Sequence, residues 1–327
     1  MLVADDGGWS RMGWRSWSDL AEVRARLAAG ADPNVLVRGR GLPLHRAAAD
    51  GSADVVAELA GLVGDVDAED DGRTALWVAV QADKPDNARA LVAAGADPWR
   101  PMMADWSPGR LSLASRTPDL FTAPSGAPGL SLAESATVAE AHRLIDALGK
   151  FEYDGLSLSC VGGIDGAEAV RRLEATVVEH DDPETMVQAL WDDALSENAV
   201  LTVGVTDVPG GCVVSQPWAY GASMPGVARR LSTGTVCYAM YANPKSGNQG
   251  SIFRDGVGEG WDLHPGGGWS AADDPAEEIL RTYLHRHRAV AYCCAYAGLK
   301  PTDARPFTGP PDLWVQLPVR DYWSHSS

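Results

Sequence analysis

The residues in this sequence that are best suited to chemistry are carboxylates, and they are concentrated in one stretch. Between Arg172 and Arg229 there is no Lys or Arg, whereas seven Asp and Glu residues fall within the 19 positions 179–197. Uncompensated like charge of this kind costs stability through self-repulsion. Two interpretations stay open: a solvated helical face, or a docking surface for a basic partner. The candidate binding residues in this stretch are Glu179, Asp181, Asp182, Glu184, Asp192 and Asp193.

Patterns that would indicate catalysis or cofactor binding are weak by comparison. A G-G-x-x-G turn at 162–166 follows a possible strand and precedes a helix, where a dinucleotide fingerprint would lie. Asp165 explains this turn as a helix N-cap, and its charge would repel a pyrophosphate. The sequence has no GxSxG, HExxH or P-loop motif. We therefore predict no catalytic residue, metal site or cofactor, and the one place to look for a catalytic cleft is WDLHPGGGW at 261–269.

The overall charge is strongly negative and unevenly distributed. The chain has 44 Asp and Glu against 27 Lys and Arg, a formal net charge of −17. Residues 1–150 contribute 15 − 21 = −6, and residues 151–327 contribute 12 − 23 = −11. Contacts to phosphates need Lys and Arg, so we do not expect direct nucleic-acid binding. A basic protein is the partner that this charge favours, and an acidic mimic of nucleic acid is one alternative.

Several features predict a cytoplasmic protein that does not cross a membrane. No run of 18 or more apolar residues occurs, and the first ten residues, MLVADDGGWS, have acids where a secretory leader has basic residues. The five cysteines form no CxxC motif and are odd in number. Reduced, mostly buried thiols are the expected state.

An internal repeat organises the first third of the chain. GADPN at 30–34 and GADPW at 95–99 start 65 residues apart, which is 32 plus 33. Between them lie the cores L-P-L-H-x-A-A at 42–48 and T-A-L-W-x-A at 74–79. A period near 33 with these cores is typical of ankyrin repeats, and residues 14–118 resemble an ankyrin-repeat array. The resemblance implies a short α solenoid that binds another protein.

Individual positions in the repeats have different expected roles. By the resemblance, His45 is a structural residue whose ring bonds backbone groups between repeats. Trp77 replaces this histidine in the next repeat, and it either fills the core or anchors a partner. Trp99 and Arg100, at the exit of that repeat, are further candidate binding residues. Three tryptophans are expected to cover the open end of the array, with Ser18 as the N-cap of the helix that follows: Trp9, Trp14 and Trp17.

The pattern changes after the repeats. Residues 117–130 are rich in proline and glycine and read as a connector, and a helix is expected over 134–148. Strand and helix patterns then alternate from residue 156, which predicts an α+β domain with a mostly antiparallel sheet. One long helix is expected over 274–298, and a proline-rich segment that wraps the surface follows it. The predicted organisation is ankyrin repeats at 1–116, a linker with a bridging helix at 117–150, and an acidic α+β domain at 151–327.

Parts of the second domain, residues 218–221 and the R-R-L-S-x-G-T turn at 229–235, resemble an uncharacterised family of small bacterial domains. That family has no established activity to carry over, so function must be argued from charge and repeats. The favoured hypothesis is a protein–protein interaction protein, in its concrete form an immunity or antitoxin-like inhibitor of a basic toxin. The alternative is a defence or regulatory enzyme whose second domain is catalytic and whose repeats recruit substrate.

Overall fold

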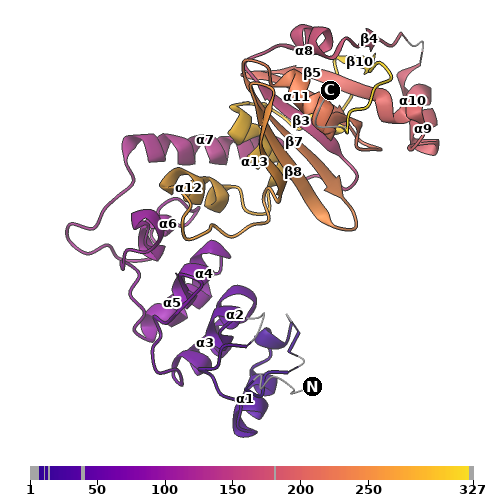
Figure 1. Ribbon diagram of the computed structural model, residues 1–327. Coiled ribbons are helices and arrows are strands. Elements are labelled where there is room, and N and C mark those ends of the chain that lie inside the picture. The colour runs from indigo at the N-terminus through magenta and orange to yellow at the C-terminus, as the bar shows by residue number, and fades with distance from the viewer. Residues whose placement is uncertain (1–6, 11, 14, 38–40, 180–181, 324–327) are drawn as a thin grey trace. The chain divides into compact units, whose positions relative to one another are not determined.

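A computed structural model describes residues 7–10, 12–13, 15–37, 41–179 and 182–323. The chain forms two compact units (Figure 1). Unit 1 comprises Met1–Ala136 together with Ser270–Tyr283, and unit 2 comprises Thr137–Trp269 together with Leu284–Ser327. This division differs from the expected boundaries at 116 and 150, because the first unit extends further and includes a segment from late in the sequence.

Unit 1 is built from consecutive short helix pairs. Helix α2 packs on α4 and α3 packs on α5, so each pair lies against the next. The side chains of Leu44, Val55, Val56 and Leu76 are buried in the shared apolar interior. The elements are η1 (Ser16–Ser18), α1 (Leu20–Ala28), α2 (Pro43–Asp50), α3 (Ala53–Ala60), β1 (Glu69–Asp70), β2 (Arg73–Thr74), α4 (Ala75–Gln81), α5 (Pro85–Ala93), η2 (Met103–Asp105) and α6 (Pro108–Ser112).

Polar side chains join one helix pair to the next. The Asn87 amide of α5 donates hydrogen bonds to three carbonyls at the end of α2, those of Ala47, Ala48 and Gly51, at 3.1–3.3 Å. Nε2 of His45 in α2 lies 2.8 Å from the carbonyl oxygen of Arg73 in β2. These bonds satisfy buried carbonyl groups that would otherwise destabilise the stack.

At the N-terminal end of unit 1, the structure agrees in part with the expected tryptophan cover and helix N-cap. Trp9 and Trp17 are buried and stacked with ring centroids 5.5 Å apart, while Trp14 lies outside the described residues. The N-cap of α1 is Asp19 rather than Ser18, since the Asp19 carboxylate accepts from the first free N–H groups of the helix. The Ser18 hydroxyl instead donates to the Asp50 carbonyl.

The late segment of unit 1 contains α12 (Ala276–Leu284). The Arg73 guanidinium donates to the Ser270 carbonyl, and the buried Trp106 indole donates to the Ala276 carbonyl at 3.1 Å. The single helix expected over 274–298 is therefore two helices, α12 and α13 (Ala289–Ala297). His287 has a positive φ of 57° in the turn between them, which no continuous α-helix allows.

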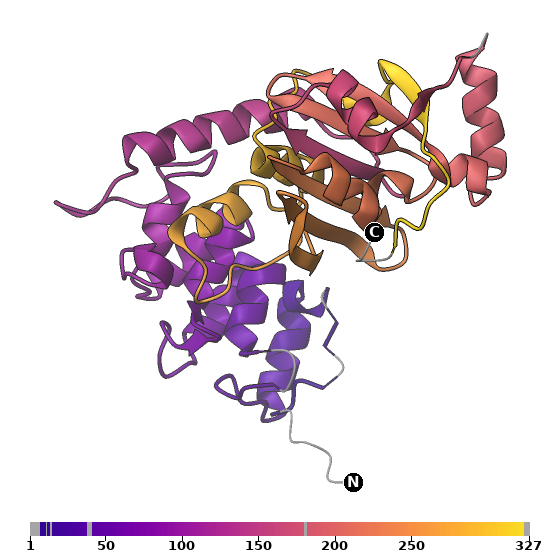
Figure 2. The same ribbon diagram turned by 45° about the horizontal axis from the view of Figure 1, so that its top comes forward.

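Unit 2 contains an eight-stranded sheet in the order β4-β10-β5-β6-β3-β7-β8-β9, and every neighbouring pair is antiparallel (Figures 1 and 2). The segments VLTVGV at 200–205 and CVVSQP at 212–217, on either side of a Pro-Gly-Gly turn, predict a hairpin, and the structure forms it as β5–β6. The strands are β3 (Ser157–Gly162), β4 (Thr176–Val177), β5 (Thr202–Val208), β6 (Gly211–Gln216), β7 (Val236–Asn243), β8 (Gly247–Arg254), β9 (Val257–Leu263) and β10 (Leu313–Gln316).

Helices cover both faces of this sheet, and each face has its own apolar core. One core includes Leu173, Leu201 and Trp218. The other includes Leu144, Cys160 and Cys293. The helices over the first core are α8 (Gly166–Leu173), α9 (Pro183–Asp192), α10 (Glu197–Leu201) and α11 (Pro225–Leu231). Those over the second core are α7 (Leu132–Leu148), α13 and α14 (Arg305–Thr308).

The environment of His45 makes the stability of unit 1 depend on pH. Burial lowers the pKa of His45, and the bond to the Arg73 carbonyl and the nearby Asp70 carboxylate offset only part of this effect. In the unfolded chain the ring takes up a proton near its ordinary pKa of about 6.5. Below that pH the unfolded chain therefore binds more protons, and the free energy of unfolding falls as pH falls.

We predict that replacing His45 by Gln makes this fall shallower between pH 7.5 and pH 5.5. The measurement is urea unfolding of wild type and variant across this range, with hydrogen exchange of the α2–α5 amides as the readout. The other histidines titrate in both proteins, so the difference between the two curves isolates His45. Parallel curves would show that His45 does not resist protonation in the native state.

Candidate binding surfaces

Most of the acidic candidates lie on or beside α9. Glu179 is exposed before the helix, and Asp181 lies outside the described residues. Asp182 is the N-cap of α9, and its carboxylate accepts from the N–H groups of Glu184 and Thr185. The sequence predicts a helix over about 183–194, and α9 (Pro183–Asp192) begins at that position and ends before the short helix α10 (Glu197–Leu201).

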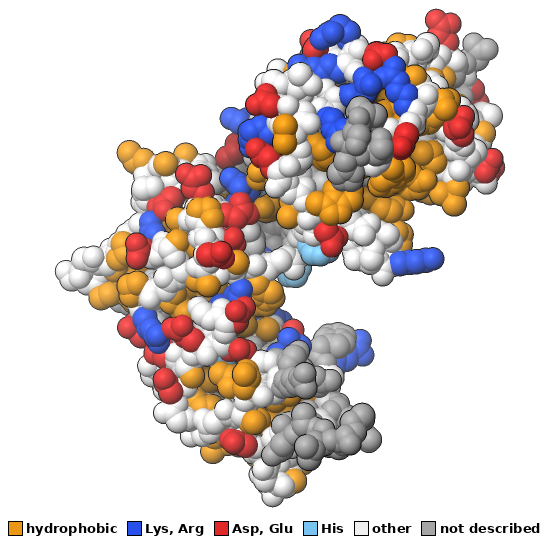
Figure 3. Space-filling view, viewed as in Figure 1, with side chains coloured by type: hydrophobic (Ala, Val, Ile, Leu, Met, Phe, Trp, Pro, Cys, Tyr) orange, Lys and Arg blue, Asp and Glu red, His pale blue; other side chains and the backbone are white. Residues whose placement is uncertain are grey.

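The remaining acidic candidates are exposed around α9. Asp192, at its end, accepts a hydrogen bond from Gln188 at 2.8 Å, and Asp193 follows directly. Figure 3 shows Asp and Glu side chains over the end of unit 2 that carries α9 and α10. The structure thus brings Glu184, Asp192 and Asp193 onto one exposed element, whereas Asp182 is committed to capping it.

A groove of about 670 Å³ runs beside α9 within unit 2. Volumes of 300–1,000 Å³ are typical of ligand sites. One wall is a single stripe of α9 with the spacing i, i+3, i+4, i+7: Glu184, Val187, Gln188 and Trp191. The other described lining residues come from three places: the segment before β3, the end of β6 with the residue after it, and the stretch from α14 to β10. They are Glu152, Tyr153, Asp154, Leu156, Ser215, Pro217, Phe307, Thr308, Gly309, Pro310, Pro311 and Trp314.

Three tryptophans contact one another at the groove: Trp191 and Trp314 line it, and Trp218 packs against both. Trp218 is buried, and its ring stacks on Trp314 with centroids 5.3 Å apart. The edge of Trp191 meets Trp218 in a T-shaped contact at 6.3 Å. The Trp218 indole also donates to the Ala199 carbonyl of α10 at 2.9 Å, and the Gln216 amide donates to the same carbonyl at 2.6 Å. Bonds from Gln216, the last residue of β6, and from Trp218, two residues later, therefore hold α10 against the sheet.

The charged side chains that line the groove are all negative. Glu152, Asp154 and Glu184 line it, and none of its described lining residues is Lys or Arg. Within the described part of the chain, none of these three carboxylates forms an ion pair. A groove that combines aromatic rings with unpaired carboxylates is suited to a cationic group.

Sequence reasoning found only one member of this groove, Glu184. Trp191 could have been found from the sequence, because it follows Glu184 by seven residues, or two helical turns, and so lies on the same face of the helix. Glu152 and Asp154 are in a loop more than 25 residues before α9, and Trp314 is in a strand that was not predicted. Proximity in the fold, rather than any local pattern, brings these residues together.

The candidates in unit 1 have mostly structural contacts. Trp77 is fully buried and its indole donates to Gln81 at 2.9 Å, so it fills the core and does not anchor a partner. The Trp99 indole donates to the Thr122 carbonyl at 3.1 Å and remains partly exposed. Arg100 donates to the Asp67 carbonyl and forms an ion pair with a carboxylate of β1. Trp99 and Arg100 keep surface for a partner, and Trp77 does not.

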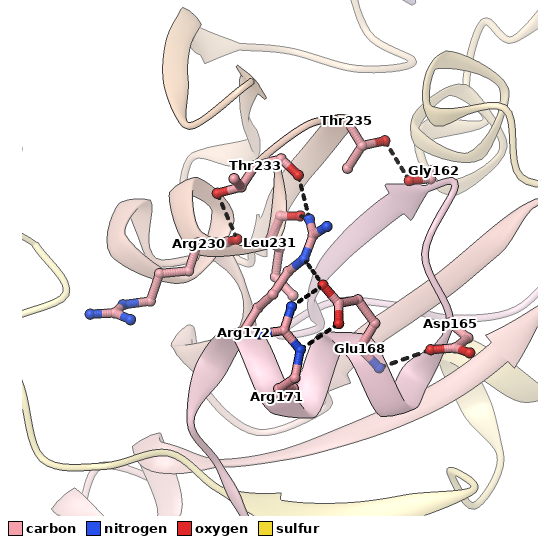
Figure 4. Close-up of polar contacts among 9 residues, drawn as sticks. All are labelled: Gly162, Asp165, Glu168, Arg171, Arg172, Arg230, Leu231, Thr233 and Thr235. Atoms are coloured by element: carbon pink, nitrogen blue, oxygen red, sulfur yellow. Dashed lines mark hydrogen bonds and ion pairs between the residues drawn. The ribbon is translucent and has the colours of Figure 1, made fainter.

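The glycine-rich turn after β3 uses its polar groups internally (Figure 4). The Gly162 carbonyl accepts from the Thr235 hydroxyl, and the Gly166 N–H donates to Asp207. The Asp165 carboxylate accepts from the Glu168 N–H at 2.8 Å, as the predicted N-cap requires. The N–H groups of Gly163 and Gly166, two that could face a pyrophosphate in a dinucleotide site, donate to protein acceptors here.

Arg172 joins this turn to the R-R-L-S-x-G-T segment (Figure 4). Its guanidinium donates to Glu168 and to the carbonyls of Leu231 and Thr233 at 2.6–2.7 Å. Hydrogen bonds from Arg171 and Arg172 lower the pKa of Glu168 to about 2. These bonds of Arg172 form a structural clasp between α8 and the end of α11. Figure 3 shows Lys and Arg side chains gathered over α8, away from the acidic α9.

Other candidate chemistry has little support in the geometry. His264 is exposed, and its Nδ1 lies 2.9 Å from the Asn248 carbonyl oxygen. All five cysteines are buried, and burial raises the pKa of Cys237 to about 12. Among the described residues, no group of three or more His, Cys, Asp or Glu side chains could hold a metal ion. No described helix is both long enough and apolar enough to cross a bilayer.

Comparison with known proteins supports one part of the chain. Residues 18–102 match the family model for ankyrin repeats in three copies. No curated protein matches the chain. Ankyrin repeats have a protein–protein interaction role, and the helix pairs α2–α3 and α4–α5 lie within the matched range.

We predict that Arg172→Leu destabilises unit 2 by about 2–3 kcal/mol, because two carbonyls lose a charged donor and Glu168 loses a partner. Arg171 is the matched control, since its side chain is 72% exposed, and Arg171→Ala should change stability by less than about 0.5 kcal/mol. Chemical unfolding followed by hydrogen exchange of the β3 and β7 amides measures both. Equal effects of the two substitutions would refute the clasp.

Proposed function

We propose that this chain is an interaction protein that binds a basic protein partner, using its ankyrin repeats and the acidic face around α9. The observation that carries the proposal is the groove beside α9, where three carboxylates that form no ion pair with the described residues lie near the exposed ring of Trp191. Like charges that lie close together repel one another in the isolated protein, and a cationic partner that covers them relieves this repulsion. Ankyrin repeats supply a second surface for the same partner.

The concrete form of the proposal is an immunity or antitoxin-like inhibitor that neutralises a basic toxin. A net charge of −17 would steer a cationic protein toward this chain and speed association. The function would be carried out in the cytoplasm, where five buried thiols remain reduced. Inhibition by such a protein needs no chemistry, since covering the active surface of the toxin suffices.

Capture from a lysate of the native host, at sodium chloride concentrations from 50 to 500 mM, tests the basic partner. Exposed charge contacts are screened within about 8–10 Å at physiological salt. The captured partner should therefore be basic and should be released as salt rises. Retention that does not change with salt, or an acidic partner, would contradict the proposal.

A matched pair of variants separates the effect of the carboxylates on α9 from the effect of the total net charge on capture. Neutralising Glu184, Asp192 and Asp193 to their amides should weaken capture at low salt. Neutralising three exposed carboxylates of unit 1 that lie outside the ankyrin repeats changes the net charge by the same amount and should have little effect: Asp105, Asp119 and Asp273. If both variants lose the partner equally, only the total charge matters.

A further inference from the structure

We propose that the groove beside α9 binds an arginine side chain carried by an extended segment of the partner, with the guanidinium over the tryptophans and its N–H groups directed to the carboxylates. This inference rests on the proposed function and names what the acidic face recognises. On this inference the groove binds arginine specifically, whereas the proposed function alone needs only general charge attraction.

The charge of the site requires a cation. Glu152 and Asp154 precede β3 and Glu184 begins the α9 stripe, so carboxylates come from two segments far apart in the sequence and line one groove. The described lining supplies no Lys or Arg to neutralise them. In the described structure the nearby arginines are engaged elsewhere: Arg305, for example, forms an ion pair with Asp312 at 2.7 Å. A ligand can therefore supply the missing positive charge.

The aromatic rings favour arginine over lysine. Trp191 keeps 47% of its surface exposed, and Trp314 is partly buried in the same groove. A guanidinium is planar and weakly hydrated, stacks on indole rings and binds carboxylates with two parallel hydrogen bonds. An ammonium is compact and more strongly hydrated, and it cannot make the bidentate contact. The stack of Trp218 on Trp314 keeps the rings in place before a ligand arrives.

The size of the groove indicates a chain segment rather than a single side chain. A volume of about 670 Å³ is in the middle of the range for ligands much larger than one guanidinium. Pro217, Pro310 and Pro311 line it, and prolines present apolar rings without an N–H donor. Such rings can pack against the aliphatic stem of arginine and its neighbours. Aromatic and proline-lined grooves are suited to extended peptides.

The test uses the full chain and a short fluorescently labelled peptide with two arginines among alanines and glycines. Its counterparts replace both arginines by lysine or by citrulline, which keeps the shape of arginine and removes the charge. Fluorescence anisotropy at 100 mM sodium chloride measures the dissociation constants. The expected order of affinity is arginine, then lysine, then citrulline.

Two pairs of variants locate the binding. Trp191→Ala and Glu184→Gln should each weaken binding of the arginine peptide by roughly 2-fold to 30-fold. The control for Glu184→Gln is Glu197→Gln, which makes the same substitution at an exposed position of the neighbouring helix α10, outside the groove lining, and should leave the affinity unchanged within about 2-fold. Because Trp191 contacts Trp218, Trp191→Leu is made in parallel and the unfolding midpoints of all variants are compared.

The outcomes separate this inference from the proposed function. Equal weakening by Glu184→Gln and Glu197→Gln, or equal affinity for the arginine and lysine peptides, would overturn the arginine site. So would failure of the arginine peptide to bind at all. In each case salt-dependent capture of a basic partner can still stand, because general attraction to the acidic face around α9 does not require an arginine-specific contact. Loss of binding only in the groove variants, with unchanged unfolding midpoints, supports the site.

Discussion

A sheet with apolar side chains on both faces is stable only when helices cover both faces, and this constraint shapes unit 2. Helix α9 meets the constraint with Met186 and Leu190, which pack toward the core with Trp218. Because an α-helix repeats every 3.6 residues, burying that face leaves Glu184 and Trp191 exposed on the neighbouring face, where the Trp191 ring still contacts Trp218. The packing requirement of the sheet therefore creates the acidic and aromatic stripe that we assign to binding.

Unit 1 depends on a segment that is distant in the sequence. The guanidinium of Arg73 and the indole of Trp106 bond to carbonyls in Ser270–Tyr283, so the unit is completed only after most of unit 2 has been passed in chain order. The chain thus crosses between the units more than once. Two modules joined by several crossings cannot be separated by one cut at the linker, which explains why local composition at 117–130 does not mark the whole boundary.

Local signals predicted much of the fold, and long-range contacts decided the rest. The repeat cores, the Asp165 cap and the β5–β6 hairpin follow from neighbouring residues, and the structure agrees with them. Strand β10 has four residues flanked by prolines, so its pairing with β5 has little local pattern to reveal it. The groove was missed for the same reason: its carboxylates and rings come from several segments, and only Glu184 was singled out by charge. The burial of Trp77 likewise depends on its neighbours in the repeats and not on its own type.

The central claim is that the groove beside α9 receives a cationic side chain. The most direct measurement is an NMR titration of the full chain with the arginine peptide, following the indole N–H resonances. The account predicts that the signals of Trp191 and Trp314 shift together with a single dissociation constant, while those of the buried Trp77 and Trp106 stay in place. Shifts confined to tryptophans outside the groove, or no shift at Trp191 while the peptide binds, would contradict it.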